Sequence, residues 1–176
     1  MQTDSASAAQ HLTFTLAGHV FAMPLLRVRE IVEYADPTPV PQVPPFIRGM
    51  MNLRGRVVPV IDLALKLDLP KSAVTRRTCV VIVETGSPEL GILGIVADSV
   101  SQVIELDKGD VLPPPDFGMP VRLDYLRGLG NHAGHFVLML DVDRVLSFAE
   151  LIAVSAASQV PATGAGAETV QAEAVR

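Results

Sequence analysis

The chain is poor in cysteine and in aromatic residues, and it has no tryptophan. Its single cysteine cannot form an internal disulfide, which fits a protein of the reducing cytoplasm. Aromatic residues make up only 5% of the sequence, so the core must be built from valine, isoleucine and leucine. No apolar run reaches the roughly 18 residues that a membrane-spanning helix needs. The first residues, MQTDSAS, lack the basic and apolar regions of a signal peptide. These absences predict a cytosolic protein.

Charge and composition exclude further classes. The net charge of −5 argues against a nucleic-acid partner, because that affinity rests on lysine and arginine neutralising phosphates. Hydrophobic residues make up 49% of the chain, which is enough to bury a core in one ordinary domain or two very small ones. Residues 1–10 and 153–176 are rich in small residues and lack apolar periodicity. We expect a flexible N-terminus, a single domain over 11–152 and a low-complexity, disordered tail.

Short β-type runs bounded by turn formers dominate the domain. We expect strands at Leu12–Leu16, His19–Met23, Arg56–Ile61, Thr78–Glu84, Leu90–Val96 and His135–Leu140. Pro59 lies inside one run, which indicates an edge strand or a bulge because proline cannot donate to a ladder. Helices are few: a turn over Asp62–Leu67 and a helix over Arg144–Ile152 capped by Asp143. The pattern is typical of small β-barrels.

One motif occurs twice along the chain. Each copy holds an Arg-Gly step, an asparagine three residues after the glycine, an apolar strand and then an aspartate. The first copy is Arg48-Gly49, Asn52, Val57–Ile61 and Asp62, and the second is Arg127-Gly128, Asn131, Phe136–Leu140 and Asp141. Upstream, Phe21–Ile31 has a looser match in Gly94–Ile104. The repetition predicts two similar β subdomains.

The segment from Pro44 to Leu63, PPFIRGMMNLRGRVVPVIDL, is the most informative part of the chain. It carries no catalytic-looking group, and it combines Arg-Gly steps with a strand. Gly49 and Gly55 are expected where φ is positive or where backbones approach closely. The guanidinium of Arg54 offers five fixed donors for a carboxylate or carbonyl of a partner, the alternative being a solvated turn arginine. This layout predicts a protein that binds proteins.

The same segment resembles the signature of CheW-type coupling proteins, which join chemoreceptors to the histidine kinase CheA in bacterial chemosensory arrays. The resemblance covers roughly Leu12 to Leu151. It implies a mainly β fold of two SH3-like, five-stranded β-barrel subdomains with a few short helices. One would span roughly 11–70 plus the C-terminal helix, and the other roughly 76–142. It further implies a non-enzymatic adaptor without a cofactor, located in the cytoplasm and recruited to membrane-associated receptor arrays. Its partners would be the regulatory domain of a CheA-type kinase and the cytoplasmic tip of a methyl-accepting chemoreceptor.

The resemblance also implies two sets of contact residues. The receptor-binding set lines a groove between the subdomains and comprises Val28, Glu30, Ile31, Arg54, Val96, Val100 and Val103. The kinase-binding set comprises Gly49, Met50 and Asn52. The alternative for the valines is ordinary core packing. A helical tip would anchor in such a groove through aliphatic side chains repeating at i, i+3 and i+4. We also expect Glu30 to pair with Arg54 and to hold the Arg-Gly turn in its docking geometry.

Two other functions stay open. The first is a CheW-like adaptor of a non-flagellar pathway that controls pili, biofilm or a second messenger. The second, more remote, is a metal-assisted hydrolase using His132, His135 and Asp141. Two histidines are not a metal site, however, and their glycine-rich surroundings are typical of a hairpin loop. Asp62 and Asp141 each follow a strand, where capping the next turn is the simpler role. Cys79 has no histidine beside it and is expected to be inert. We therefore predict neither catalytic residues nor metal ligands.

Overall fold

The computed structural model describes residues 8–115 and 123–147 and the single positions 150, 153 and 156. Strands account for about half of the described residues, and the helical elements between Ala9 and Leu140 are single turns. The strands are β1 (Ala9–Leu16), β2 (His19–Pro24), β3 (Val28–Glu33), β4 (Ile47–Leu53), β5 (Arg56–Ile61), β6 (Cys79–Glu84), β7 (Ile92–Ala97), β8 (Ser99–Leu106), β9 (Val111–Leu112), β10 (Leu126–His132) and β11 (His135–Leu140). The helical turns are η1 (Leu25–Arg27), α1 (Leu63–Lys66), η2 (Lys108–Asp110) and η3 (Leu123–Tyr125). The mainly β prediction is confirmed.

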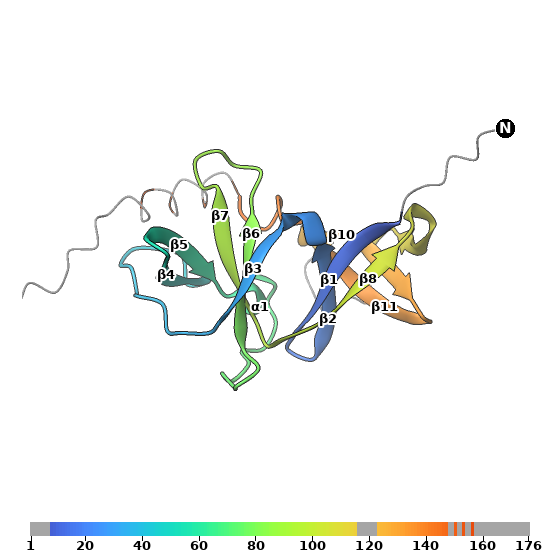
Figure 1. Cartoon of the computed structure of the whole chain (residues 1–176), viewed down its shortest axis with the longest axis horizontal. Coiled ribbons are helices and arrows are strands. Elements are labelled where there is room, and N and C mark those ends of the chain that lie inside the picture. Colours follow the sequence, from blue (N-terminus) through green and yellow to red (C-terminus); the bar gives the residue numbers. More distant parts are fainter. Residues whose placement is uncertain (1–7, 116–122, 148–149, 151–152, 154–155, 157–176) are drawn as a thin grey trace, which may run out of the picture.

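The strands form two sheets that lie side by side as two lobes (Figure 1). One sheet has the order β8-β1-β2-β11-β10-β9, and the other has the order β3-β6-β7-β5-β4. Neighbouring strands are antiparallel except for β11 beside β2 and β5 beside β7, which are parallel. Two β subdomains are therefore present, as the repeated motif predicted.

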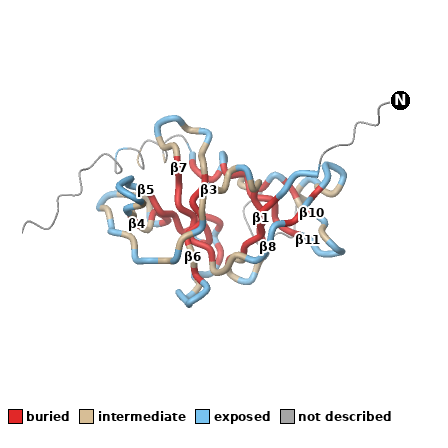
Figure 2. The backbone as a smooth tube through the Cα atoms, viewed as in Figure 1, coloured by how far each residue is buried: buried red, intermediate tan, exposed pale blue. Residues whose placement is uncertain are grey.

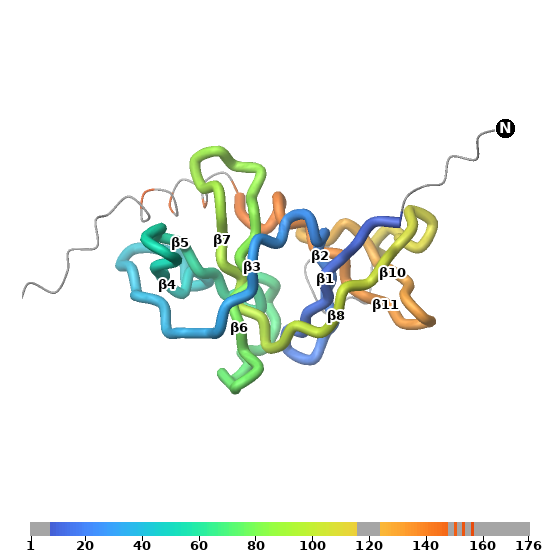
Figure 3. Tube along the Cα trace, viewed as in Figure 1, coloured from blue at the N-terminus to red at the C-terminus, as the bar shows by residue number. Residues whose placement is uncertain are grey.

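The predicted boundaries of the subdomains differ from the composition of the sheets. Strands β1 and β2 were expected with residues 11–70, but they pair with β8 and β11 from the second half of the chain. Likewise β6 and β7 were expected within 76–142, but they share a sheet with β3, β4 and β5. The reason is a reciprocal crossing, which Figure 3 shows along the trace: β3 leaves β2 to pair with β6, and β8 leaves β7 to pair with β1. No single cut along the sequence separates sheets that exchange strands in this way.

Alternating side chains bury both faces of the central strands. On β6, Val81 and Val83 belong to a large apolar cluster that draws on both sheets, whereas Val80 and Ile82 belong to a smaller cluster of the β3–β7 sheet. A third cluster around Ile104 and Met139 fills the other lobe. Figure 2 shows the buried backbone following the strands of both lobes and the region where they meet. Since successive strand residues point to opposite faces, near-continuous aliphatic runs such as CVVIV are buried on both sides.

Pro59 lies in β5, which is flanked by β4 and β7 and is not an edge strand. Its partner on β4 is Met50, whose N–H and C=O both bond outward to Thr38, each at 2.8 Å. Proline at position 59 has no N–H to donate. Both backbone groups of Met50 are bonded to Thr38 instead, so the proline costs the ladder no hydrogen bond to Met50. The predicted bulge lies instead in β4, between Ile47 and Gly49.

The two predicted helices differ in outcome. Asp62 caps α1, because its Oδ1 accepts a hydrogen bond from Leu65 N at 3.1 Å. The helix predicted to begin at Arg144 does not begin there, since residues 142–146 form a turn and a bend. Ser147 and Glu150 instead exchange the two hydrogen bonds of a capping box. Residues 148, 149, 151 and 152 of the predicted helix lie outside the described part.

Asp143, the expected helix cap, instead accepts hydrogen bonds from two other segments. Its Oδ2 accepts from Arg27 Nη2 at 2.5 Å and its Oδ1 accepts from Gly86 N at 3.0 Å. It thus ties the segment after β11 to η1 and to the β6–β7 loop. No described helix is long and apolar enough to cross a membrane.

Candidate functional site

The β4–β5 hairpin turns through Arg54 and Gly55, whose φ values are +50° and +85°. Two consecutive positive φ values are the mark of a type I′ hairpin turn, whose twist matches that of the strands. The turn is held by Asn52, whose Oδ1 accepts from Gly55 N at 2.8 Å. A non-glycine residue at positive φ is uncommon, and the side chain of Arg54 is 81% exposed. The fold therefore presents this guanidinium to solvent from a rigid turn.

Arg54 is oriented by Glu30 of β3. Arg54 Nη1 donates to Oε1 at 3.2 Å and Nη2 donates to Oε2 at 3.0 Å, a two-pronged pair that confirms the predicted contact. Exposed ion pairs stabilise a fold by only about 0.2–1 kcal/mol, so this pair contributes little to folding. A two-pronged geometry does fix the plane of a guanidinium, which is the property that a docking arginine needs.

A hollow of about 160 Å³ lies beside this pair. Charged side chains form its rim and aliphatic side chains form its floor. Its lining residues are Arg29, Glu30, Leu53, Arg54, Arg56, Ile82 and Ile92. Arg29 also pairs with Glu84. Every strand of the β3–β7 sheet contributes to this surface, so the sheet positions its charges.

The expected kinase-binding residues do not share one environment. Gly49 is buried with φ of +143°, and a Cβ there would lie 2.2 Å from the carbonyl oxygen of Thr38. Met50 is 7% exposed. Only Asn52 lies at the surface. A side chain at position 49 would therefore strike the backbone of Thr38, and the kinase contact of Gly49 stays a prediction.

The expected receptor-binding residues also divide by exposure. Ile31 on β3 and Val103 on β8 are each 45% exposed. Val28 and Val100 are partly buried against the large cluster, and Val96 is only 6% exposed. Val96 is therefore a core residue, the alternative that sequence left open. The exposed pair lies on the two strands that cross between the lobes (Figure 1).

Sequence reasoning missed two exposed apolar side chains at equivalent places in the repeat. Val57 lies opposite Asn52 and is 43% exposed, and Phe136 lies opposite Asn131 and is 59% exposed. Both stand near the start of an apolar run that was expected to form a strand. Strand alternation does not identify them, because Ile61 and Leu140 lie on the same strand faces and are buried. Both are exposed because they lie at the turn end of their hairpin.

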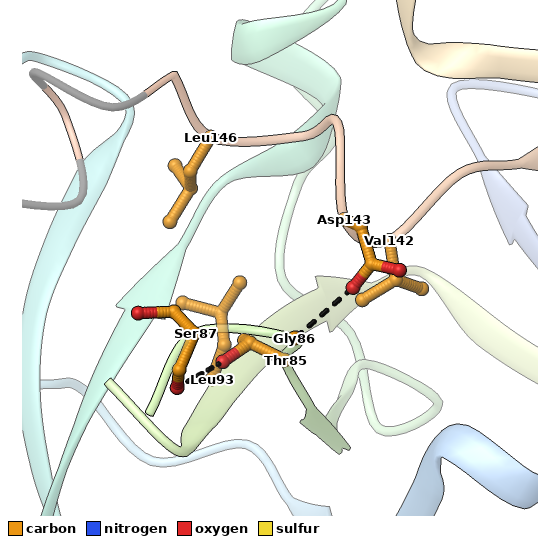
Figure 4. A pocket seen from close by; sticks show the side chains of 7 residues that line it. All are labelled: Thr85, Gly86, Ser87, Leu93, Val142, Asp143 and Leu146. Atoms are coloured by element: carbon orange, nitrogen blue, oxygen red, sulfur yellow. Dashed lines mark hydrogen bonds between the residues drawn. The ribbon is translucent and has the colours of Figure 1, made fainter. Parts of the chain in front are cut away.

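A second hollow, of about 360 Å³, lies between the β6–β7 loop and the segment after β11 (Figure 4). Leu93, Val142 and Leu146 form its apolar side. Among its described lining residues the one carboxylate is that of Asp143, which is engaged by Arg27 and by Gly86 N. Its described lining therefore offers no free ionisable group for chemistry.

The hydrolase alternative finds no assembled site. His132 and His135 face each other across the β10–β11 turn, but no group of three or more possible metal ligands occurs in the part of the chain that the structure describes. Asp141 accepts from Asp143 N at 3.1 Å, the capping role that sequence predicted. Burial raises the pKa of the Cys79 thiol, which makes it a poorer nucleophile.

The sequence model of the CheW-like domain family matches residues 10–150 of this chain. The chain belongs to the CheW-like family. The chemotaxis protein CheW of Klebsiella aerogenes is 33% identical over 145 residues, which cover 82% of this chain and 86% of that protein. Protein FrzA of Myxococcus xanthus is 30% identical over 163 residues, which cover 88% and 99% of the two chains.

A solved structure agrees with this fold. The crystal structure of the scaffolding protein TtCheW from Thermoanaerobacter tengcongensis superposes with a TM-score of 0.74, at 24% identity, over 81% of this chain and 95% of that one. The two-subdomain β architecture is therefore that of a CheW protein.

Proposed function

We propose that this chain is a non-enzymatic adaptor that couples chemoreceptors to a CheA-type histidine kinase. The observation that carries the proposal is the Arg54 hairpin, in which an NLRG turn holds an exposed guanidinium at positive φ and Glu30 fixes its plane. Such a surface binds a partner and offers no nucleophile or acid-base pair. Membership of the CheW-like family supports the same role.

The receptor contact would use Ile31 of β3 and Val103 of β8, together with Arg54 of the β4–β5 turn. The receptor partner of CheW-type proteins has a helical tip. A helix anchors in a groove through aliphatic side chains at i, i+3 and i+4. The half-exposed Ile31 and Val103 supply matching apolar surface. Val28 and Val100, which are partly buried on the same two strands, would support this contact.

The kinase contact would use the hairpins. Val57 and Phe136 are exposed apolar residues at equivalent positions, one in each lobe. A CheW-like regulatory domain placed side by side with this chain could cover such a position and exclude water from it. Asn52 would lie at the rim of the Val57 surface, since the two residues are paired. Gly49 and Met50 would act indirectly by holding Thr38 across the edge of β4.

Coupling would then be positional. The β3–β7 sheet carries both Glu30 at the receptor face and Val57 at the kinase face, so a shift at one contact biases the geometry of the other. Each contact is expected to be modest, and repetition in an array would supply avidity. No observation favours the alternative adaptor of a pilus, biofilm or second-messenger pathway.

The test is calorimetric binding of the full chain to two probes from the same genome: the regulatory domain of a CheA-type kinase and the cytoplasmic fragment of a chemoreceptor. Wild-type chain should bind both. Phe136→Glu should weaken kinase binding about tenfold or more and spare the receptor, because it places a charge in an apolar contact. Leu65→Glu on α1, also exposed at 44%, is the matched control. If the wild-type chain binds neither probe, the proposed function is wrong.

A further inference from the structure

One arginine in the hollow beside the Arg54 turn has no partner among the residues that the structure describes. Three of its lining side chains are guanidiniums. Arg54 is paired with Glu30, and Arg29 is paired with Glu84. Within residues 8–115 and 123–147, the guanidinium of Arg56 makes no hydrogen bond or ion pair. Arg56 is exposed at the first position of β5, directly across the turn from Leu53.

The local charge differs in sign from that of the whole chain. Three guanidiniums meet two carboxylates here, which leaves one positive charge, whereas the chain as a whole carries −5. One uncompensated positive charge matches one carboxylate. A phosphate would bring a larger negative charge close to Glu30 and Glu84 and would be repelled by them.

The floor of the hollow is aliphatic and its volume is small. Ile82 is fully buried and Ile92 is 8% exposed, with the partly buried Leu53 beside them. A volume of about 160 Å³ lies below the roughly 300 Å³ at which small-molecule sites begin. The hollow therefore suits a single side chain rather than a cofactor.

We propose that this hollow receives an acidic side chain from the helical tip of the receptor, with an aliphatic neighbour three or four positions away resting on the floor. The proposal rests on the proposed function and specifies the chemistry of its receptor contact. Arg56 takes the carboxylate with its two-pronged guanidinium, and Arg54, held by Glu30, lines the same opening. Neighbours at i+3 or i+4 lie on the same helix face, so one helix supplies both the charge and the aliphatic contact.

The test measures calorimetric binding of the receptor cytoplasmic fragment to Arg56→Glu, Arg56→Gln and the control Arg76→Glu. Arg76 is exposed and lies outside the hollow, so it carries the same charge change elsewhere. We expect a loss of about tenfold or more for Arg56→Glu, a smaller loss for Arg56→Gln and no change for the control. Binding by the wild type should also weaken with salt more steeply than binding by Arg56→Gln.

The other outcomes separate this inference from the proposed function. If Arg56→Glu binds the receptor fragment like the wild type while Ile31→Glu weakens it, the adaptor function stands and the acidic contact is refuted. If Arg56→Glu loses the kinase domain but keeps the receptor, the hollow belongs to the kinase and the inference is wrong. If the wild-type chain binds no receptor fragment, the proposed function fails first. Because Arg56 is exposed, each variant is expected to keep the wild-type circular dichroism spectrum.

Discussion

The hairpins β4–β5 and β10–β11 are built alike and end differently. Each has a bulge at its Arg-Gly step, and each glycine approaches a carbonyl oxygen of a neighbouring segment. After each hairpin an aspartate donates its N–H to the carbonyl of an aromatic residue: Asp62 to Phe46 at 2.7 Å, and Asp141 to Tyr125 at 2.9 Å. These shared features give the two lobes the same hairpin framework.

The difference lies in the turns. Arg54 and Ala133 occupy the same backbone conformation, each with φ of +50° and each followed by glycine. Arg54 reaches Glu30 on β3, whereas the methyl group of Ala133 cannot reach a partner. The backbone of this turn thus needs no arginine. The Arg54–Glu30 pair is the feature that the β10–β11 hairpin lacks, so we expect it to serve function. Matched substitutions in the two hairpins distinguish the features that stabilise the fold from those that serve binding.

The largest expected effect comes from the two bulge glycines. A Cβ at Gly49 would lie 2.2 Å from Thr38 O, and one at Gly128 would lie 2.3 Å from Leu112 O. Backbone atoms cannot yield as a flexible side chain can, so alanine at either site should cost about 3 kcal/mol or more. Gly49→Ala should cost more, because its φ of +143° adds strain for any side chain.

Urea unfolding of the two alanine variants measures this difference. Equal free energies of unfolding for both would show that strain at Gly49 adds nothing. A Gly49→Ala variant as stable as the wild type would refute the geometry of the β4 edge.

The next largest expected effect is a difference in stabilising energy between the two arginine–aspartate pairs of the hairpins. Arg48 Nη2 donates to Asp62 Oδ2 at 2.8 Å, with side chains 22% and 9% exposed. Arg127 Nε lies 3.4 Å from Asp141 Oδ2, and that arginine is 50% exposed. Asp62→Asn should cost about 2 kcal/mol, and Asp141→Asn less than about 1, because breaking a buried pair leaves a charge without compensation. The same unfolding assay applies, and a reversed order would contradict this account.

The second hairpin also faces a buried histidine. Burial of His11, with a smaller contribution from the charge of Arg127, lowers its pKa below the ordinary value of about 6.5. Below that pH the unfolded chain takes up a proton that the folded chain resists, so the free energy of unfolding should fall as pH drops and level off above it. His11→Gln should flatten that slope in unfolding curves recorded across this range. A slope that His11→Gln leaves intact would assign the pH dependence to another group.

The smallest effect concerns the turns themselves. Asparagine before glycine is the preferred pair for a type I′ turn. Arg54→Asn and Ala133→Asn should therefore each stabilise the fold, by roughly 0.5 kcal/mol. Thermal unfolding is the measurement, and destabilisation by Arg54→Asn alone would mean that the Glu30 pair matters for folding.

Local patterns were enough to predict part of this molecule. The cap at Asp62 follows from an aspartate placed just before an apolar turn. The contact of Glu30 with Arg54 was predicted from opposite charges and from the resemblance of the segment. The repeated motif predicted two lobes. In each case the information lies within a few residues or within one recognisable segment.

The features that were missed depend on contacts distant in sequence. The burial of Gly49 and Met50 follows from the bridge to Thr38, which no pattern near them announces. Strand β3 pairs with β6, and β8 pairs with β1, so each crosses from the sheet of the preceding strand to the other sheet. These pairings depend on partners that lie far away in the sequence. Val96 and Val103 look alike in sequence, yet one is buried in β7 and the other is half exposed on β8.

The central claim is that Arg54 serves binding and not folding. The most direct test compares binding of the chemoreceptor cytoplasmic fragment to Arg54→Asn and Ala133→Asn by calorimetry. Both variants keep the turn, so the account predicts that Arg54→Asn weakens binding about tenfold or more while Ala133→Asn binds like the wild type. Wild-type affinity in both variants would contradict the account, because the Arg54 hairpin would then be only a turn.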